Sequence, residues 1–276
     1  MRDKFKLWII KNISSKYLEI LGNKGISTTK IPKEKAAVVS DLFPFRIEND
    51  WNTYFELLNI YEILDPLEND LKSNWVKLNF YDIKGNFTSD YKVKLDESLK
   101  STLDIKEITK SLNIKKNGTF AVFHERTPNW LKNLNSFVAE RGYIGYENIN
   151  FGPIKSFIHG NLDAISLENT KKENLLGNYS FFEKEYYLQH ELLSNFTYEL
   201  FWVNTTSKSQ KLIIIERSLN KDKSTILIIP PKGVKSYKKL SNKNKINVKI
   251  VVKSMLYIAR PIIFKYMKNS FDVFHG

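Results

Sequence analysis

The sequence has 276 residues, of which 42% are hydrophobic and 13% aromatic, so it can bury a core as one large domain or two smaller ones. It contains no cysteine, which excludes disulfides, thiolate metal sites and cysteine nucleophiles. The net charge of +13 lies entirely in residues 207–276, which hold 16 basic and 3 acidic residues, whereas residues 1–206 hold 27 of each. Any long-range attraction to polyanions is therefore expected from the last quarter of the chain.

The N-terminal segment, residues 1–34, is predicted to be an arm that precedes the folded part. Its apolar run Leu7–Ile10 is interrupted by Lys11 and is too short for the core of a signal peptide. No stretch approaches the roughly 18 apolar residues that a membrane-spanning helix needs. We predict a cytoplasmic protein without a transmembrane segment, with signal-less export as the alternative. Short helices are predicted over residues 15–22 and 127–137.

Most of the remaining sequence alternates apolar and polar residues, which is the period of a strand with one buried face. In residues 75–82, Val76, Leu78 and Phe80 share one face, and the residues between them share the other. Gly85 and its polar neighbours predict a hairpin turn. The same pattern predicts strands over residues 53–59, 75–82, 91–96, 118–125, 137–149, 198–204, 211–217, 224–231, 245–254 and 260–266.

The order of these strands repeats along the chain. The aromatic strands 53–59 and 198–204 both end in asparagine and are each followed by a predicted hairpin with the same strand spacing. A single sheet of this kind exposes an apolar face unless a second sheet covers it. We therefore predict a mostly β fold of two tandem antiparallel β-sandwich modules, immunoglobulin-like or jelly-roll-like, over residues 35–162 and 163–276.

The second predicted module carries a dense lysine segment, residues 230–253. Its central lysines, Lys235, Lys238 and Lys239, are candidates for binding a polyanion such as an acidic glycan, a nucleic acid or an acidic membrane surface. The alternative is that lysines solvate a sheet face and protect its edge. Tyr237 is the only aromatic residue among them and arginine is scarce, so base readout of a nucleic acid is disfavoured.

The chain has four histidines, His124, His159, His190 and His275, and two of them precede glycine at the ends of the predicted modules. Equivalent ends of tandem sandwiches lie tens of ångströms apart, so we predict that His159 and His275 share no site. A mononuclear metal site of His124, Glu125 and His159 is the alternative. Because no short metal-binding spacing occurs, we predict no metal and no cofactor.

Catalytic motifs are missing from the sequence as well. It contains no G-x-S-x-G nucleophile elbow and no glycine-rich phosphate loop. The acidic residues of 64–74 do not single out a pair for acid and base catalysis. These observations favour a non-enzymatic protein over an enzyme.

An aromatic segment in the first predicted module departs from simple alternation. It contains the candidate binding residues Arg126, Trp130, Arg141, Tyr143 and Tyr146. Aromatic rings beside charged groups suit a sugar, whose C–H face stacks on the ring. They equally suit a protein interface or the core of the fold, and the sequence does not choose between these three.

The sequence therefore predicts a binding or assembly protein whose partner is an acidic macromolecule, with polysaccharide as one candidate, or a second copy of the chain. The first alternative is an enzyme that acts on a carbohydrate or nucleotide-sugar at the seam between the modules. A cleft there that contains two or more of His124, Glu125, His159 and His190 would favour it. The second alternative is a non-specific nucleic-acid binder, which would lose affinity steeply with added salt.

Overall fold

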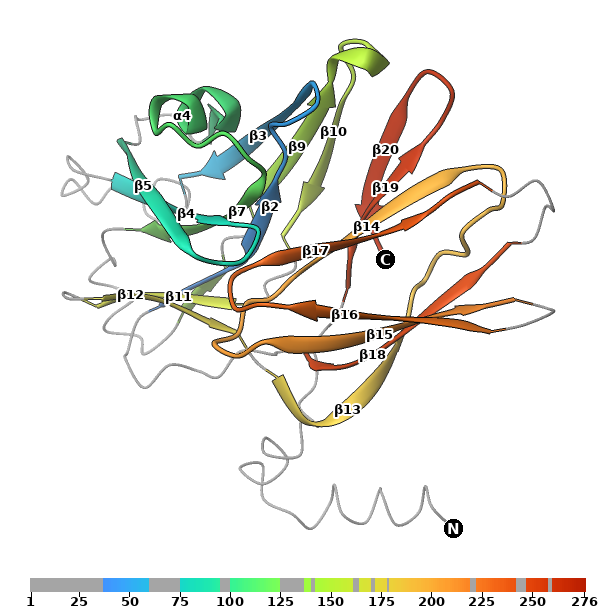
Figure 1. The fold of residues 1–276 in the computed structure, drawn as a ribbon. Helices are drawn as coiled ribbons and strands as arrows, with labels where there is room; N and C mark the ends of the chain where they lie inside the picture. Colours follow the sequence, from blue (N-terminus) through green and yellow to red (C-terminus); the bar gives the residue numbers. More distant parts are fainter. Residues whose placement is uncertain are drawn as a thin grey trace.

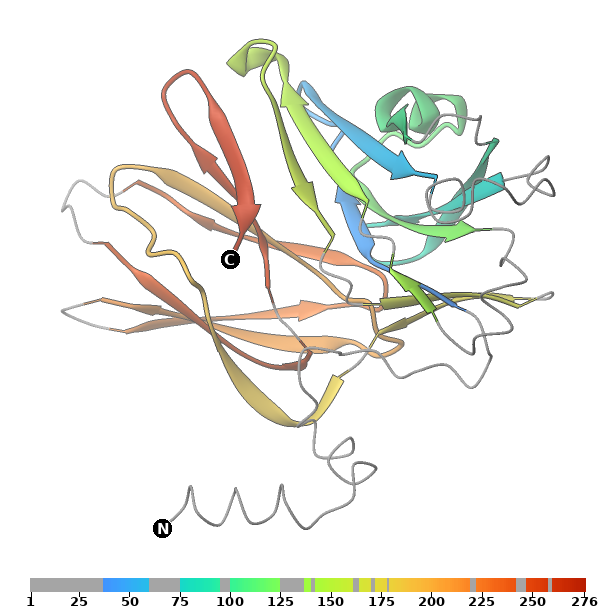
Figure 2. The ribbon, with the colours of Figure 1, turned by 180° about the vertical axis from the view of Figure 1, so that it is seen from behind.

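The structure is a computed structural model, shown from two sides in Figures 1 and 2. It describes residues 37–59, 75–94, 100–124, 137–139, 142–160, 164–169, 172–177, 179–218, 222–241, 247–257 and 260–276. The predicted arm (1–34) lies outside these residues, as do the predicted helix over 15–22 and all but the last residue of the one over 127–137. The residues on either side of the predicted module boundary, Leu162 and Asp163, also lie outside them.

The prediction of a mostly β chain is confirmed. Residues 75–82 form β4 (Trp75–Asp82), and the aromatic strands become β3 (Trp51–Leu58) and β14 (Thr197–Val203). In β3 every second residue is buried, as the alternating pattern requires. Local periodicity therefore located these strands to within a few residues.

Four sheets are wholly antiparallel, and we number them as blades I to IV. Blade I has the order β2-β7-β4-β5, with β2 (Leu42–Phe45), β7 (Gly118–His124) and β5 (Phe87–Lys94) around β4. Blade II has the order β10-β9-β3-β6, with β10 (Lys155–His159), β9 (Tyr143–Asn148) and β6 (Lys100–Asp104) around β3.

The other two blades come from the C-terminal half of the chain. Blade III has the order β17-β14-β19-β20, with β17 (Val234–Lys239), β19 (Ile262–Tyr266) and β20 (Phe271–His275) around β14. Blade IV has the order β13-β18-β15-β16 and consists of β13 (Tyr179–Tyr187), β18 (Lys249–Leu256), β15 (Gln210–Arg217) and β16 (Lys223–Ile229).

A fifth sheet covers the outer face of blade I. Its order is β12-β11-β1-β8, with β12 (Lys172–Gly177), β11 (Ala164–Asn169), β1 (Ala37–Ser40) and β8 (Phe137–Ala139), and β1 pairs with β8 in parallel. Leu175 of this sheet is buried with Leu42, Tyr81 and Phe123 of blade I. Figures 1 and 2 both show β11 and β12 below blade I.

The prediction of two tandem β-sandwich modules is wrong, because the four antiparallel sheets are arranged as a four-blade β-propeller. In Figures 1 and 2 the blades fan out around the molecule. The recurring strand spacing in the sequence corresponds to the hairpin β4–β5 of blade I and the hairpin β15–β16 of blade IV. The spacing therefore marked hairpins of two blades and not two sandwich modules.

The physical reason is that blade III is buried on both faces. Phe264 of β19 packs into a core that contains Phe43 and Phe120 of blade I, whereas its neighbour Ile263 packs into the core of blade IV with Ile214. A two-sheet module would bury one face of each sheet. The apolar core therefore continues from blade I through blades II and III.

The turn between β16 and β17 returns to blade I. The backbone N–H of Val234 donates to the carbonyl of Ile83 at 3.3 Å, and the hydroxyl of Thr119 donates to the carbonyl of Lys232. Gly85, the predicted hairpin glycine, has a φ of +81°, and its α-carbon lies against the carbonyl of Pro231. These contacts join the last blades to the first.

The sequence patterns missed the α-helix α4 (Ile105–Ser111), which follows β6 directly. Its signals are present in the sequence. Asp104 is the N-cap, and its carboxylate accepts a hydrogen bond from the backbone N–H of Glu107 at 3.0 Å. Ile105 and Ile108 face the core. A short 3-10 helix, η2 (Ile149–Phe151), follows β9.

Candidate functional site: the outer face of blade IV

The candidate site is a surface whose residues follow from strand register. In β15, Leu212, Ile214 and Glu216 are buried, so the residues between them point outward. We define the blade IV face as these outward residues and those of their cross-strand partners that are not buried, namely Lys211, Ile213, Ile215 and Arg217 of β15, Ser224, Ile226 and Ile228 of β16, and Lys249 and Lys253 of β18.

The isoleucines of β16 make this face unusually apolar for a surface. Ile226 is 57% exposed and Ile228 is 52% exposed, and neither belongs to a buried cluster of the described residues. The corresponding face of blade I, which has the same arrangement of strands, is covered by the fifth sheet. Exposed apolar area on a sheet face is typical of an interaction surface.

Cations lie on the same face as these isoleucines, on β15 and β18. Lys253 pairs with Glu185 of β13 at 2.7 Å, and Arg217 lies 3.9 Å from Asp222. Hydrogen bonds from Lys253 and Tyr187 lower the pKa of the Glu185 carboxyl. Lys211 and Lys249 are exposed and have no ion pair among the described residues. The face therefore carries a positive charge that its own acidic neighbours only partly compensate.

The three predicted polyanion-binding lysines lie on β17 of blade III and do not share a face. Lys235 is exposed, and Lys239 is on the same side of the strand. Lys239 forms a 2.7 Å ion pair with Glu216, a carboxylate whose side chain is 7% exposed. Lys238 lies on the opposite side, across from Glu199 of β14. The structure therefore does not gather Lys235, Lys238 and Lys239 into one patch.

The Glu216 carboxylate is stabilised in its charged form. Burial alone would raise the pKa of this carboxyl, but hydrogen bonds from Lys239 and Tyr237 lower the pKa overall. Lys239 is thus engaged in a partly buried ion pair. Of the three predicted lysines, it is the one least available to an external anion.

The aromatic candidates are only partly described. Arg126, Trp130 and Arg141 lie outside the described residues. Tyr143 is 42% exposed on the outer face of blade II, and its ring meets His159 edge-on at 6.5 Å. Tyr146 is fully buried, and its hydroxyl donates to the carbonyl of Pro44 at 2.7 Å. The two tyrosines are therefore not on one surface, and Tyr146 is a core residue.

His159 and His275 are in contact, so the prediction that they lie far apart is wrong. Their ring centroids are 5.0 Å apart, and Nε2 of His275 lies 2.7 Å from the carbonyl oxygen of His159. The cause is that the edge strands β10 and β20 of neighbouring blades meet. The backbone N–H of Val273 donates to the hydroxyl of Ser156 at 3.1 Å.

This histidine pair does not make a metal site with other residues of the described chain. The residues that the structure describes contain no group of three His, Asp or Glu side chains that could hold a metal ion. His190 instead packs its ring against Phe274 at 5.0 Å. The side chains of His124 and Glu125 lie outside the described part.

His275 is expected to make stability depend on pH. Burial lowers its pKa to about 4. An unfolded histidine titrates near ~6.5, so between these values the unfolded chain binds more protons. The contribution of His275 to the free energy of unfolding should therefore have its full value above pH 6.5, and the free energy of unfolding should decrease by up to ~3 kcal/mol as the pH drops toward 4.

The measurement is urea denaturation at pH 7 and pH 5, with His275→Gln beside the wild type. The glutamine variant should lose a large part of the difference between the two pH values, because its side chain does not titrate. His190→Gln, with an exposed ring, is the control and should keep the wild-type difference. An unchanged pH dependence in His275→Gln would assign the effect to other groups.

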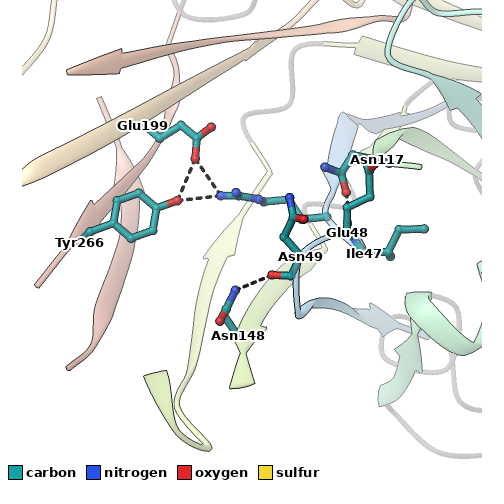
Figure 3. Close-up of polar contacts among 8 residues, drawn as sticks. Ile47, Glu48, Asn49, Asn117, Asn148, Glu199 and Tyr266 are labelled. Atoms are coloured by element: carbon teal, nitrogen blue, oxygen red, sulfur yellow. Dashed lines mark hydrogen bonds and ion pairs between the residues drawn. The ribbon is translucent and has the colours of Figure 1, made fainter. Parts of the chain in front are cut away.

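A second polar cluster lies where blades I, II and III meet. Arg46 follows β2, and its guanidinium stacks on the rings of Trp51 at 4.0 Å, Phe264 at 4.7 Å and Phe201 at 5.1 Å. Glu199 and Tyr266 reach the same guanidinium, at 3.1 Å and 2.9 Å (Figure 3). Burial raises the pKa of the Tyr266 hydroxyl, which donates to Glu199 at 2.8 Å.

The loop that carries Arg46 is itself anchored. The side-chain oxygen of Asn117 accepts hydrogen bonds from the backbone N–H groups of Ile47 and Glu48, at 2.7 Å and 3.1 Å, and Asn148 donates to the carbonyl of Asn49 at 3.2 Å (Figure 3). Charge and aromatic contacts around Arg46 are largely satisfied from within the protein. We therefore interpret this cluster as a structural junction between blades.

Comparison with known proteins gives no family for the chain: no protein-family model matches it, and neither does any curated protein. Among the described residues, no helix has both the length and the apolar character needed to span a membrane. Function must therefore be argued from the surface chemistry of the structure.

Proposed function

We propose that the protein is a non-enzymatic binding protein whose partner is an acidic macromolecule, and that it binds this partner through the blade IV face. The observation that supports this most is the position of Lys211 and Lys249. Both are exposed cations without an ion pair among the described residues, and they lie on the same face as Ile226 and Ile228, which are each more than half exposed.

The physical basis is a combination of long-range and short-range attraction. Clustered cations raise the local concentration of a polyanion within about 8–10 Å at ordinary salt. The isoleucines between them then contact apolar parts of the partner, such as sugar C–H groups. An acidic polysaccharide offers both anionic groups and such apolar faces, so we propose it as the first partner to test.

The enzyme alternative has less support from the described residues. Its four seam residues were His124, Glu125, His159 and His190. Of the two with described side chains, His159 contacts His275 and Tyr143, whereas His190 contacts Phe274. These contacts do not assemble an acid, a base and a nucleophile.

The test is a charge reversal on the blade IV face. The double variant Lys211→Glu/Lys249→Glu should bind a sulfated polysaccharide and single-stranded DNA on the order of tenfold to a hundredfold more weakly than the wild type at low salt. Binding of both polymers would indicate recognition by charge, whereas binding of the polysaccharide alone would indicate a selective site.

The matched control is Lys115→Glu/Lys116→Glu. These lysines are exposed in the loop between α4 and β7, outside blade IV, and the substitution changes the net charge by the same amount. The control should keep at least most of the affinity. An equal loss in both double variants would show that net charge matters and the blade IV face does not.

A further inference from the structure

The strand β16 forms one end of blade IV. Its only sheet partner among the described residues is β15, so the outer edge of β16 carries backbone N–H and C=O groups that no described strand pairs with (Figure 1). Such an edge is a template for another strand unless the protein protects it by charges, proline or irregular register.

Four other terminal strands of the described sheets, β5, β2, β13 and β17, show such protection. β5 carries Asp90 and Lys92, β2 contains Pro44, and β13 has a register shift before Lys184. In β17, the predicted candidates Lys235, Lys238 and Lys239 occupy half of the strand. The protective use of lysine that the sequence suggested is therefore present on blade III.

β16 lacks this protection. Residues 224–229, Ser-Thr-Ile-Leu-Ile-Ile, form the longest run without a charge on any terminal strand that the structure describes, and they include neither proline nor glycine. Lys223, at the start of the strand, points toward Glu216 at 3.9 Å. A run of six uncharged residues with high strand propensity is the type of sequence that pairs edge to edge.

We propose that a second copy of this chain pairs with β16 through its own β16, antiparallel, about a twofold axis at Ile226. Opposite residues of an antiparallel pair point to the same side, so this register keeps the isoleucines on one face. Ser224 then faces Ile228 of the partner copy, and Ile226 faces the partner's Ile226. No charged residue of either strand meets a charge of equal sign within this paired segment.

Self-pairing suits this edge better than an unrelated strand for two reasons. A twofold axis makes one sequence complementary to itself, which is the usual geometry of a dimer. The cations of the blade IV face, Lys211 and Arg217, lie on β15, one strand away from the axis. The dimer would therefore join two copies of the blade IV face in one sheet, but its formation does not depend on polyanion binding.

The absence of cysteine from the sequence allows a direct test of the register by disulfide cross-linking. In the Ile226→Cys variant the two α-carbons would lie about 4.5–5.5 Å apart, within the range that a disulfide spans. In Ile228→Cys the two sites would lie roughly 14 Å apart along the strands, too far for a disulfide. We expect mild oxidation to give covalent dimers of the first variant and not of the second.

A second measurement does not depend on oxidation. Sedimentation equilibrium should show a dimer for the wild type. Ile226→Lys should associate at least about tenfold more weakly, because two like charges then face each other. The control Ile149→Lys, which replaces an exposed isoleucine of η2, should associate like the wild type. A wild type that stays monomeric up to high concentration would overturn the proposal. So would equal cross-linking at residues 226 and 228, or a dimer that tolerates Ile226→Lys.

Discussion

Replacing Arg46 with alanine is expected to lower the free energy of unfolding by about 3–5 kcal/mol. The Arg46 side chain is 12% exposed and pairs with Glu199, whose side chain is 19% exposed. Removing it would leave a carboxylate in a mostly buried position and would also remove three aromatic stacking contacts. The measurement is urea denaturation at pH 7, and a loss below about 1 kcal/mol would contradict the interpretation as a junction.

Three further variants separate the charge from the packing. Arg46→Met keeps an aliphatic chain between the rings, and Arg46→Met/Glu199→Gln removes both charges. Because a lone buried charge is the larger penalty, the double variant should be more stable than Arg46→Met alone. Arg46→Lys keeps the charge but loses the planar stacking surface, so we expect an intermediate loss. Coupling near zero between positions 46 and 199 would show that the ion pair is not important for stability.

Gly85→Ala is expected to destabilise the protein by roughly 3 kcal/mol or more, for two separate reasons. The φ of +81° strains any residue with a β-carbon, and that β-carbon would overlap the backbone carbonyl of Pro231. The turn from Pro230 to Gly233 would have to move, and with it the hydrogen bond from Val234 to Ile83. Thermal or urea denaturation measures the change.

The steric part can be isolated with asparagine and with a second glycine. Asparagine tolerates positive φ better than alanine, so a loss that persists in Gly85→Asn reports the clash with the turn. Gly152 also has a positive φ, +75°, but a β-carbon there would meet no atom within 4 Å. Gly152 combines this φ with a ψ of −170°, a region essentially restricted to glycine, so Gly152→Ala reports backbone strain without a clash. If Gly85→Asn were nearly as stable as the wild type, the contact between the turn and blade I would not contribute.

Strand positions were the part of the fold that the sequence could predict, because period-two alternation is a local property. β4, β7 and β14 lie where the apolar pattern placed them. The arrangement of the sheets was not predictable in this way. In β19, Ile262, Ile263 and Phe264 are all buried because blade III has a neighbour on each face, and a run of apolar residues does not say which sheets those neighbours are.

The junction and the histidine pair could not be predicted because their partners are distant in the sequence. Arg46 meets Glu199 and Tyr266 only after blades I and III have come together. His159 and His275 meet because two edge strands adjoin, which the assumption of separate modules had excluded. Neither contact leaves a spacing signal in the sequence.

For the candidate site, strand periodicity in the sequence carries a further signal. Period two alone places Lys235 and Lys239 on one side of a strand and Lys238 on the other, so these three could not form one patch. The same rule applied to residues 211–217 places Lys211 and Arg217 on one side with two isoleucines. The exposure of that side, however, depends on which sheets pack on blade IV, and only the structure supplies this information.

The central claim, that the blade IV face binds an acidic macromolecule, is tested most directly by the salt dependence of binding. The observed association constant for a single-stranded DNA of defined length would be measured over a series of salt concentrations. The logarithm of this constant falls with the logarithm of the salt concentration, and the magnitude of that slope should decrease by about 1.4 in Lys211→Glu/Lys249→Glu, because two phosphate contacts are lost. The slope should not change in Lys115→Glu/Lys116→Glu. A wild-type slope in the first variant, or the same reduction in both, would contradict the claim.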